Sequence, residues 1–247
     1  MRPPMKTATF VCGCGHSGTT LLANMFASHP QAHVPLRETE VFLQPDPGQA
    51  WEALRREAEA SGRPHFAEKT PRHVAHLDLI RGLVPGARFV LMVRDGRDVT
   101  ASFLRRMGEI ETGRARWIAD NRHVLAARGA PDAMILRYED LVADPEGALR
   151  DVCDFAGLPF APEMLRFHET PRNWFGVRRL VKGDGTKGRQ HRLLRNWQVN
   201  QPIFDGRGGW REALSAEDLA PFRTAPLREI MEAFGYGWDE AAGEAGT

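Results

Sequence analysis

The sequence predicts a three-layer α/β/α fold, in which helices cover both faces of a parallel β-sheet. Apolar, β-prone segments alternate along the chain with segments of helical periodicity. A glycine-rich loop joins the first strand to the first helix, and Phe89–Val93 is a continuous apolar run, typical of a strand buried on both faces. Strands separated by helices favour a parallel sheet wrapped on both sides. We assign all 247 residues to one domain.

The individual elements follow from periodicity and from the turn residues between them. The predicted strands are Thr7–Cys12, His33–Leu36, His65–Glu68, Arg88–Val93 and Ala133–Arg137. The predicted helices are Thr19–Ser28, Trp51–Glu59, a helix from Pro71 to about Leu83, Asp98–Met107, Arg114–Arg128, Pro145–Ala156 and Ala216–Phe234. The first helix stops at His29-Pro30, because the residue before a proline disfavours the helical region. Pro145 is well placed at the start of its helix.

The loop after the first strand has the layout of an anion-binding site. Gly13 and Gly18 stand where the Walker A pattern places its glycines, so the loop is P-loop-like. Converging backbone N–H groups and a helix N-terminus there favour a phosphate. Thr19 and Thr20 occupy the lysine and Ser/Thr positions of the pattern. The missing lysine suits a phosphate ligand without a γ-phosphate; the alternative is a βα turn that binds no ligand.

A second informative stretch follows the strand Arg88–Val93. Arg94 leaves the strand end, Asp95 is a predicted helix cap, and Ser102 lies early in the helix. A forked cation and a hydroxyl at this place suit a phosphate dianion. The alternative is a surface arginine paired with Asp95 or Asp98.

Composition limits the remaining functional classes. A net charge of +1 gives no general preference for nucleic acid, and 42% hydrophobic residues argue against global disorder. Three cysteines do not form a secreted disulfide framework, and Cys12 and Cys14 are interpreted as small residues beside the loop. No apolar run approaches membrane-spanning length, so we expect a cytoplasmic protein without a membrane span. No carboxylate or Cys/His cluster calls for a metal.

Together these motifs resemble those of sulfotransferases that use 3′-phosphoadenosine 5′-phosphosulfate (PAPS) and release 3′-phosphoadenosine 5′-phosphate (PAP). The loop Gly15–Thr20 is similar to their 5′-phosphosulfate loop, and Arg94 with Ser102 to their 3′-phosphate motif. Tyr138-Glu139-Asp140-Leu141 is similar to a later strand end of the family. The resemblance is closest to the protein-tyrosine sulfotransferase branch and its bacterial relatives, and it covers the chain from Phe10 to about Trp210.

The resemblance implies roles for individual residues. Glu38 would be the general base and Lys69 a catalytic lysine. From the sequence, Glu40 is the competing base. The residues that the resemblance assigns to cofactor binding are Gly15, His16, Ser17, Gly18, Thr19, Thr20, Arg94, Ser102, Arg106 and Tyr138.

Two positions depart from the family pattern. His16 stands where relatives usually carry arginine or lysine, and Gln201 stands where relatives carry lysine before a proline. A bound phosphosulfate favours a protonated His16, which would then donate to the bridging oxygen as a third catalytic residue. The alternative is a neutral histidine that only shapes the loop. A pH–rate profile of the wild type beside His16→Arg distinguishes these roles.

The segment 171–195 is strongly basic and contains several glycines, so it is predicted to be flexible. Its basic residues are Arg172, Arg178, Arg179, Lys182, Lys187, Arg189, Arg192 and Arg195, with Asp184 as the one acid. Three roles remain open: a lid over an anionic cofactor, a site for an acidic acceptor, and a solvated loop.

We therefore expect a PAPS-dependent sulfotransferase that moves a sulfuryl group in line onto an acceptor hydroxyl. Peptide tyrosine, a carbohydrate and a small natural product all remain possible acceptors. One alternative is a P-loop-type nucleotide-dependent phosphotransferase, which Thr19 at the lysine position disfavours. Another is a non-catalytic nucleotide- or polyanion-binding protein.

Overall fold

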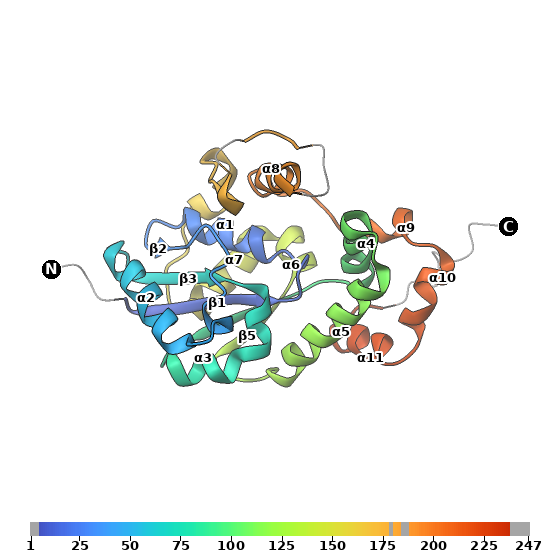
Figure 1. The fold of residues 1–247 in the computed structure, drawn as a ribbon, viewed down its shortest axis with the longest axis horizontal. Coiled ribbons are helices and arrows are strands. Elements are labelled where there is room, and N and C mark those ends of the chain that lie inside the picture. The colour runs from blue at the N-terminus through green and yellow to red at the C-terminus, as the bar shows by residue number, and fades with distance from the viewer. Residues whose placement is uncertain (1–4, 178–179, 184–187, 238–247) are drawn as a thin grey trace.

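The computed structural model describes residues 5–177, 180–183 and 188–237 and contains a five-stranded parallel sheet (Figure 1). The strands are β1 (Thr7–Gly13), β2 (Ala32–His33), β3 (His65–Lys69), β4 (Arg88–Val93) and β5 (Ala133–Arg137). Their order is β2-β3-β1-β4-β5, so β1 lies at the centre and pairs in parallel with β3 and β4. The predicted parallel sheet is confirmed, with strand limits that differ from the prediction by a few residues.

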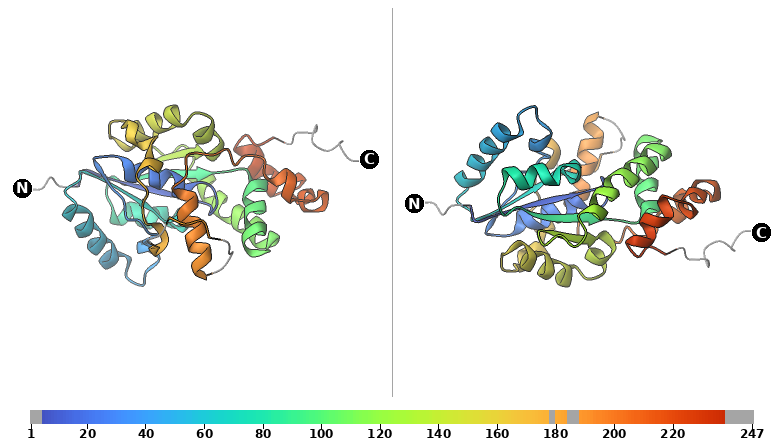
Figure 2. Two further views of the ribbon diagram at one scale, coloured as in Figure 1. Left: turned by 90° about the horizontal axis from the view of Figure 1, so that it is seen from above. Right: turned by 90° about the horizontal axis from the view of Figure 1, so that it is seen from below.

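Helices cover both faces of this sheet. The α-helices are α1 (Thr19–Ser28), α2 (Pro47–Ala60), α3 (Leu77–Leu83), α4 (Gly96–Met107), α5 (Ile110–Ala126), α6 (Tyr138–Ala143), α7 (Pro145–Ala156), α8 (Gly188–Val199), α9 (Trp210–Ala213), α10 (Ala216–Leu219) and α11 (Leu227–Ala233). Figure 2 shows the sheet edge-on between a layer with α6 and α7 and a layer with α2 and α3. The predicted three-layer arrangement is therefore confirmed.

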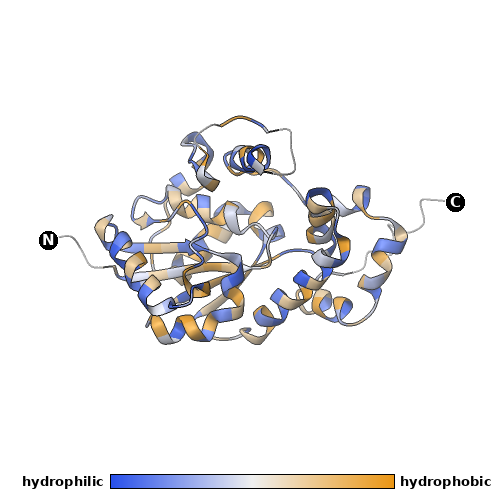
Figure 3. Ribbon diagram, viewed as in Figure 1, coloured by the Kyte–Doolittle hydropathy of each residue, from blue (hydrophilic) through white to orange (hydrophobic). Residues whose placement is uncertain are grey.

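The alternation of side chains along the central strands divides the core into two parts. Phe10 of β1 and Leu91 of β4 pack on the side of α2, α5 and α11. Val11 and Met92, each one residue further on, pack on the side of α1, α6 and α7. Hydrophobic stretches, orange in Figure 3, alternate with hydrophilic ones along the flanking helices, as expected for helices with one buried side.

Two helical predictions were wrong in part, and helix α6 was not predicted. The single helix predicted over 216–234 is divided into α10, a 3₁₀ turn (Ala220–Arg223) and α11. Pro221 and Pro226 lack the N–H that a continuous helix requires. The helix predicted from Pro71 begins as a 3₁₀ segment, Pro71–His76, before α3. Helix α6 starts at Tyr138, directly after β5.

The predicted flexible segment 171–195 is also partly corrected. Residues 188–195 belong to helix α8, which continues to Val199. The helix is held by tertiary contacts: Asn24 of α1 donates to the Val199 carbonyl at 2.6 Å, and Asn196 accepts from the Trp174 N–H at 2.7 Å. These partners are distant in the sequence, so the basic, glycine-containing sequence of the segment does not predict the contacts that hold α8.

No helix in the described part of the chain combines the length and the apolar character that crossing a bilayer requires.

Candidate active site

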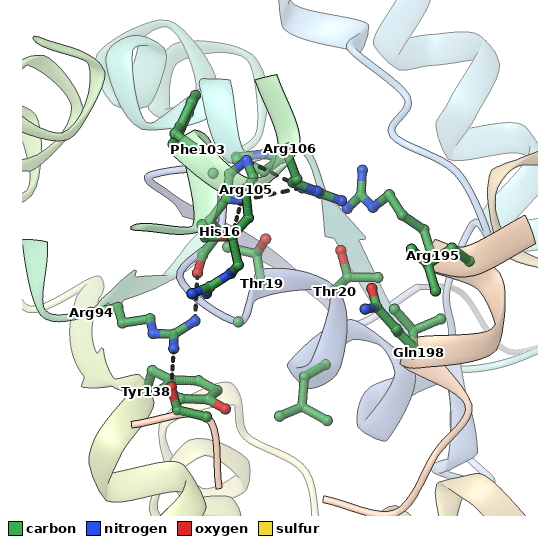
Figure 4. A pocket seen from close by; sticks show the side chains of 18 of the residues that line it. His16, Thr19, Thr20, Arg94, Phe103, Arg105, Arg106, Tyr138, Arg195 and Gln198 are labelled. Carbon is green, nitrogen blue, oxygen red and sulfur yellow. Dashed lines mark hydrogen bonds between the residues drawn. The ribbon is translucent and has the colours of Figure 1, made fainter. Parts of the chain in front are cut away.

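A cavity of about 820 Å³ lies at the carboxyl ends of the central strands (Figure 4). Parallel α/β sheets bind ligands at this edge, because the loops after the strands converge there. The predicted site residues that line the cavity are Gly15, His16, Gly18, Thr19, Thr20, Glu38, Arg94, Ser102, Arg106 and Tyr138. Ser17 and Lys69 are buried beside it without lining it.

The glycine-rich loop presents backbone donors to this cavity. His16 and Gly18 have positive φ angles of 70° and 87°, a geometry that turns successive N–H groups toward one place. No side chain in the described structure caps α1, and its first turn contains no acid. The first N–H groups of a helix have no intrahelical partner, so those of Thr19 and Thr20 remain suited to an anion. The buried Ser17 Oγ likewise has no hydrogen-bond partner among the described residues.

Gly18 is required for close packing as well as for its backbone angle. A Cβ at this position would lie 2.8 Å from Cδ2 of Tyr138. The tyrosine ring therefore lies directly against the loop, at the end of β5. Arg94 stacks on the same ring, with its guanidinium carbon 4.3 Å from the ring centre.

Arg94 is held by several groups at the end of β4. Its Nη1 donates to the His16 carbonyl at 3.3 Å, and its Nη2 donates to the Gly206 carbonyl. Asp98 lies 3.7 Å from Nη2. The pairing with Asp98 that the alternative interpretation predicted is therefore present, although Arg94 also lines the cavity. Asp95 pairs with Arg97 instead, at 2.7 Å, and caps α4 as predicted. The buried Arg94 Nε has no partner among the described residues.

His16, Ser102 and Arg106 form one hydrogen-bonded group. Nδ1 of His16 lies 2.7 Å from the Ser102 hydroxyl. Arg106 Nη1 lies 3.2 Å from both ring nitrogens. The ring also packs on Phe103, with centroids 4.3 Å apart. Residues predicted for the two ends of one nucleotide therefore lie together around His16.

The surroundings of His16 disfavour its charged form. Burial lowers the pKa of His16 to about 2, and the nearby charges of Arg106, Arg195, Arg94 and His191 act in the same direction. The ligand-free protein therefore holds a neutral imidazole, and the predicted imidazolium of the cofactor complex would have to be restored by the bound anion. The role of His16 as a charged donor stays a prediction.

This pKa predicts a measurable sensitivity to acid. The folded pKa of about 2 lies below the ordinary value of 6.5. Between these values the unfolded chain binds a proton at His16 that the folded chain does not, so stability falls as the pH decreases below about 6.5. We expect the melting temperature of ligand-free His16→Gln to fall less between neutral pH and mild acid than that of the wild type. Equal losses in both proteins would contradict the assignment.

Glu38, which lines the cavity, forms an ion pair with the buried Lys69. Lys69 Nζ lies 2.7 Å from Glu38 Oε1, and the lysine side chain is 0% exposed against 34% for the glutamate. The ammonium also lies near the rings of Trp174 and Phe175. Burial lowers the pKa of Lys69, and Glu38 partly offsets this effect. Glu38 thus faces the cavity, and Lys69 reaches it through Glu38.

A buried carboxylate holds the loop that carries Glu38. Glu68 is fully buried and accepts from the Thr39 hydroxyl at 2.8 Å, from the Thr70 hydroxyl at 2.6 Å and from His73 Nδ1 at 3.0 Å. Burial raises the pKa of Glu68, but these hydrogen bonds outweigh it and the net shift is downward. Glu40, the competing base, is exposed and does not line the cavity.

We therefore predict that Glu68 positions the loop that carries Glu38. In Glu68→Gln the amide nitrogen faces groups that need an acceptor, so we expect a loss of about 3 kcal/mol in the free energy of unfolding. Turnover measured below the melting transition should fall, because Thr39 adjoins Glu38, whereas nucleotide affinity should not change. The control Glu57→Gln removes an exposed pair with Arg37 and should alter stability by less than about 1 kcal/mol. Unchanged turnover in folded Glu68→Gln would contradict the positioning role.

Helix α8 forms one wall of the cavity. It contributes His191, Leu194, Arg195, Gln198 and Val199, and the chain continues along the cavity through Gln201 to Phe204. Other parts of the basic segment lie elsewhere: Arg172 donates to Ser28 Oγ at 3.0 Å. Of the predicted segment, Arg178, Arg179, Asp184, Gly185 and Lys187 lie outside the described residues.

Positive charge dominates the cavity. Among the described residues that line it, the arginines are Arg72, Arg94, Arg105, Arg106, Arg116 and Arg195, and the one acid is Glu38. Arg72, Arg105 and Arg116 were not predicted as site residues. Of these, only Arg105 could have been suspected from the sequence, because it adjoins the predicted Arg106. An excess of arginine suits a ligand with several phosphate or sulfate groups. No group of three or more His, Cys, Asp or Glu side chains in the described residues is arranged to hold a metal ion.

Comparison with known proteins finds sulfotransferases, the family that the sequence motifs resemble. The profile of the "Sulfotransferase family" matches residues 8–63 and 47–162, more than half of the chain. A Caenorhabditis briggsae protein, provisionally named a protein-tyrosine sulfotransferase, is 26% identical over 194 residues, which cover 65% of this chain and 69% of that protein. The chain spans only 45% of the length of a Caenorhabditis elegans relative.

Solved structures share the fold. The sulfotransferase domain of the Synechococcus PCC 7002 olefin synthase is 20% identical with a TM-score of 0.60, covering 96% of this chain and 98% of that chain. A mouse sulfotransferase complexed with PAP is 13% identical with a TM-score of 0.51, covering 92% of this chain and 88% of that chain.

Proposed function

Because the chain belongs to the sulfotransferase family, we propose that it transfers a sulfuryl group from PAPS to an acceptor hydroxyl, with Glu38 as the general base. One observation carries this proposal. A single cavity joins the uncapped loop and helix α1, the Arg94–Tyr138 stack and the Glu38 carboxylate. A nucleotide with phosphate groups at two ends, one of which carries the reacting sulfuryl group, would use all three.

The residues present fit such a nucleotide. The N–H groups of Gly18, Thr19 and Thr20 would hold the 5′-phosphosulfate together with the Ser17 hydroxyl. Ser17 Oγ and Arg94 Nε are buried donors without a hydrogen-bond partner among the described residues. Arg94 and Ser102 would hold the 3′-phosphate, Arg106 would add a further basic contact, and Tyr138 lies where the nucleotide would pass the loop. When bound, PAPS supplies the sulfuryl group.

The chemistry required of the chain is proton removal and charge stabilisation. Glu38 lines the cavity and would take the proton of the acceptor hydroxyl. Lys69, paired with Glu38 at 2.7 Å, keeps this carboxylate oriented. The neighbouring arginines stabilise the negative charge that remains on the departing phosphate.

Acceptor-dependent formation of PAP tests the proposal. The purified protein is incubated with PAPS and EDTA, and separately with a tyrosine peptide, a saccharide and a phenol. We expect PAP to accumulate with at least one of these acceptors, together with an acceptor product heavier by one sulfuryl group. PAP formation that no acceptor accelerates would contradict transfer to a hydroxyl. The same experiment identifies which of these three classes of acceptor the protein uses.

A further inference from the structure

The side chain of Arg195 reaches from α8 into the cavity without a charged partner. Its guanidinium carbon lies 4.2 Å from the centre of the Phe175 ring. Figure 4 shows the side chain directed at Arg106, and Arg195, Thr19 and Thr20 line the same cavity. Within the described ranges of the chain, Arg195 makes no ion pair or hydrogen bond. Arg94 and Arg116, in contrast, lie 3.7 Å and 2.6 Å from a carboxylate.

The position of Arg195 is fixed by the contacts of its helix. Asn196, the next residue, is 1% exposed and accepts from the Trp174 N–H. Trp174 Nε1 in turn donates to Asn24 Oδ1 of α1 at 3.0 Å. These hydrogen bonds connect helix α8 to α1, the helix that begins at the glycine-rich loop. They fix the position of Arg195 in the wall of the cavity that the start of α1 also lines.

This placement is unfavourable without an anion. Burial lowers the pKa of Arg195, and burial together with Arg195 lowers the pKa of Arg106 to about 10. The charged or titratable groups near Arg195 are His16, Arg106, Lys69, His191 and Glu38. Glu38 is the one acid among them and is already paired with Lys69. Two desolvated cations that face each other are typical of a binding site, where function is favoured over stability.

The loop itself supplies no permanent cation. Residues 13–20 contain neither lysine nor arginine, and their one basic side chain is His16. The groups near Arg195 belong to the loop on one side and to the Glu38–Lys69 pair on the other. Arg195 therefore lies between the phosphate cradle and the base, where donor and acceptor would meet.

We propose that Arg195 is a catalytic residue that binds the sulfuryl group and supplies, from helix α8, the positive charge that the loop lacks. This inference rests on the proposed function. In the transfer, the acceptor oxygen bonds to sulfur as the bond from sulfur to the bridging oxygen breaks. The acceptor proton passes to Glu38, and the electron pair stays on the 5′-phosphate of PAP. Arg195 and Arg106 would stabilise this charge.

Calorimetry and thermal melting of Arg195→Gln test the proposal without requiring turnover. Loss of a charge-assisted contact to the sulfuryl group should weaken PAPS by about tenfold or more, and PAP, which lacks that group, by clearly less. The ligand-free variant should melt at a higher temperature than the wild type, because the repulsion with Arg106 is removed. The matched control is Arg192→Gln, an exposed arginine of the same helix that does not line the cavity. It should bind both nucleotides as the wild type does.

A rescue variant makes the test independent of folding defects. In His16→Arg/Arg195→Gln the cation returns from the loop, and the preference for PAPS over PAP should return with it. Equal weakening of PAPS and PAP by Arg195→Gln, or no weakening, would overturn the inference while leaving the proposed function intact. A wild-type protein that binds neither nucleotide would overturn both. A lower melting temperature with unchanged PAPS binding would assign Arg195 to the fold alone.

Discussion

Replacing Glu38 with glutamine is expected to lower turnover by about a hundredfold or more, with little change in nucleotide affinity. The amide keeps the shape of the side chain but does not accept the proton of an acceptor hydroxyl. Glu38 lines the cavity, and its carboxylate is the one acid among the described lining residues. The nucleotide phosphates are assigned to the loop and to Arg94, so their binding does not depend on this carboxylate.

The matched control for this variant is Glu40→Gln. Glu40 lies two residues further on, is exposed and does not line the cavity. It should retain turnover close to that of the wild type. The measurement is the initial rate of PAP formation at saturating PAPS, beside PAP affinity by calorimetry. Near-normal turnover in Glu38→Gln with an inactive Glu40→Gln would move the general base to Glu40.

The second large effect is expected for Arg94→Ala. Removing the guanidinium removes a charge-assisted contact to the 3′-phosphate, which should weaken PAP by about tenfold to a hundredfold. Adenosine 5′-phosphosulfate has no 3′-phosphate, so its affinity should change much less. The exposed Arg122 of α5 lies outside the cavity, and Arg122→Ala should bind both ligands as the wild type does.

The comparison of these two ligands also separates binding from structure. Arg94 donates to the carbonyls of His16 and Gly206, so its removal affects the loop as well. A loop disturbance would weaken both ligands alike. If the affinity for adenosine 5′-phosphosulfate falls as far as that for PAP, Arg94 is not the ligand of the 3′-phosphate.

The elements that local patterns define were predictable from the sequence. The apolar run of β4 and the strand, glycine turn and helix around Gly18 have signals within a few residues, and the structure contains them. The positions of Arg94 and Ser102 on one strand end and the following helix follow from the same local pattern. Their gathering around one cavity follows from the rule that ligands lie at the carboxyl ends of parallel strands.

The remaining features depend on contacts between distant parts of the chain. Helix α8 relies on Asn24 and Trp174, and a basic, glycine-containing segment without them is typical of a solvated loop. The low pKa of His16 is caused by burial and by arginines from α4 and α8. The sequence around a histidine does not show which distant residues surround it in the fold. The same holds for Lys69, because its burial behind Glu38 depends on tertiary packing.

The central claim is that this cavity binds a nucleotide with phosphate groups at both ends and needs no metal to do so. Isothermal titration calorimetry with PAP in EDTA, beside ATP with magnesium, tests it most directly. We predict that PAP binds without metal and much more tightly than ATP with magnesium, because the loop has Thr19 at the lysine position and Arg94 awaits a second phosphate group. Equal affinity for the two nucleotides, or PAP binding only when magnesium is present, would contradict the account.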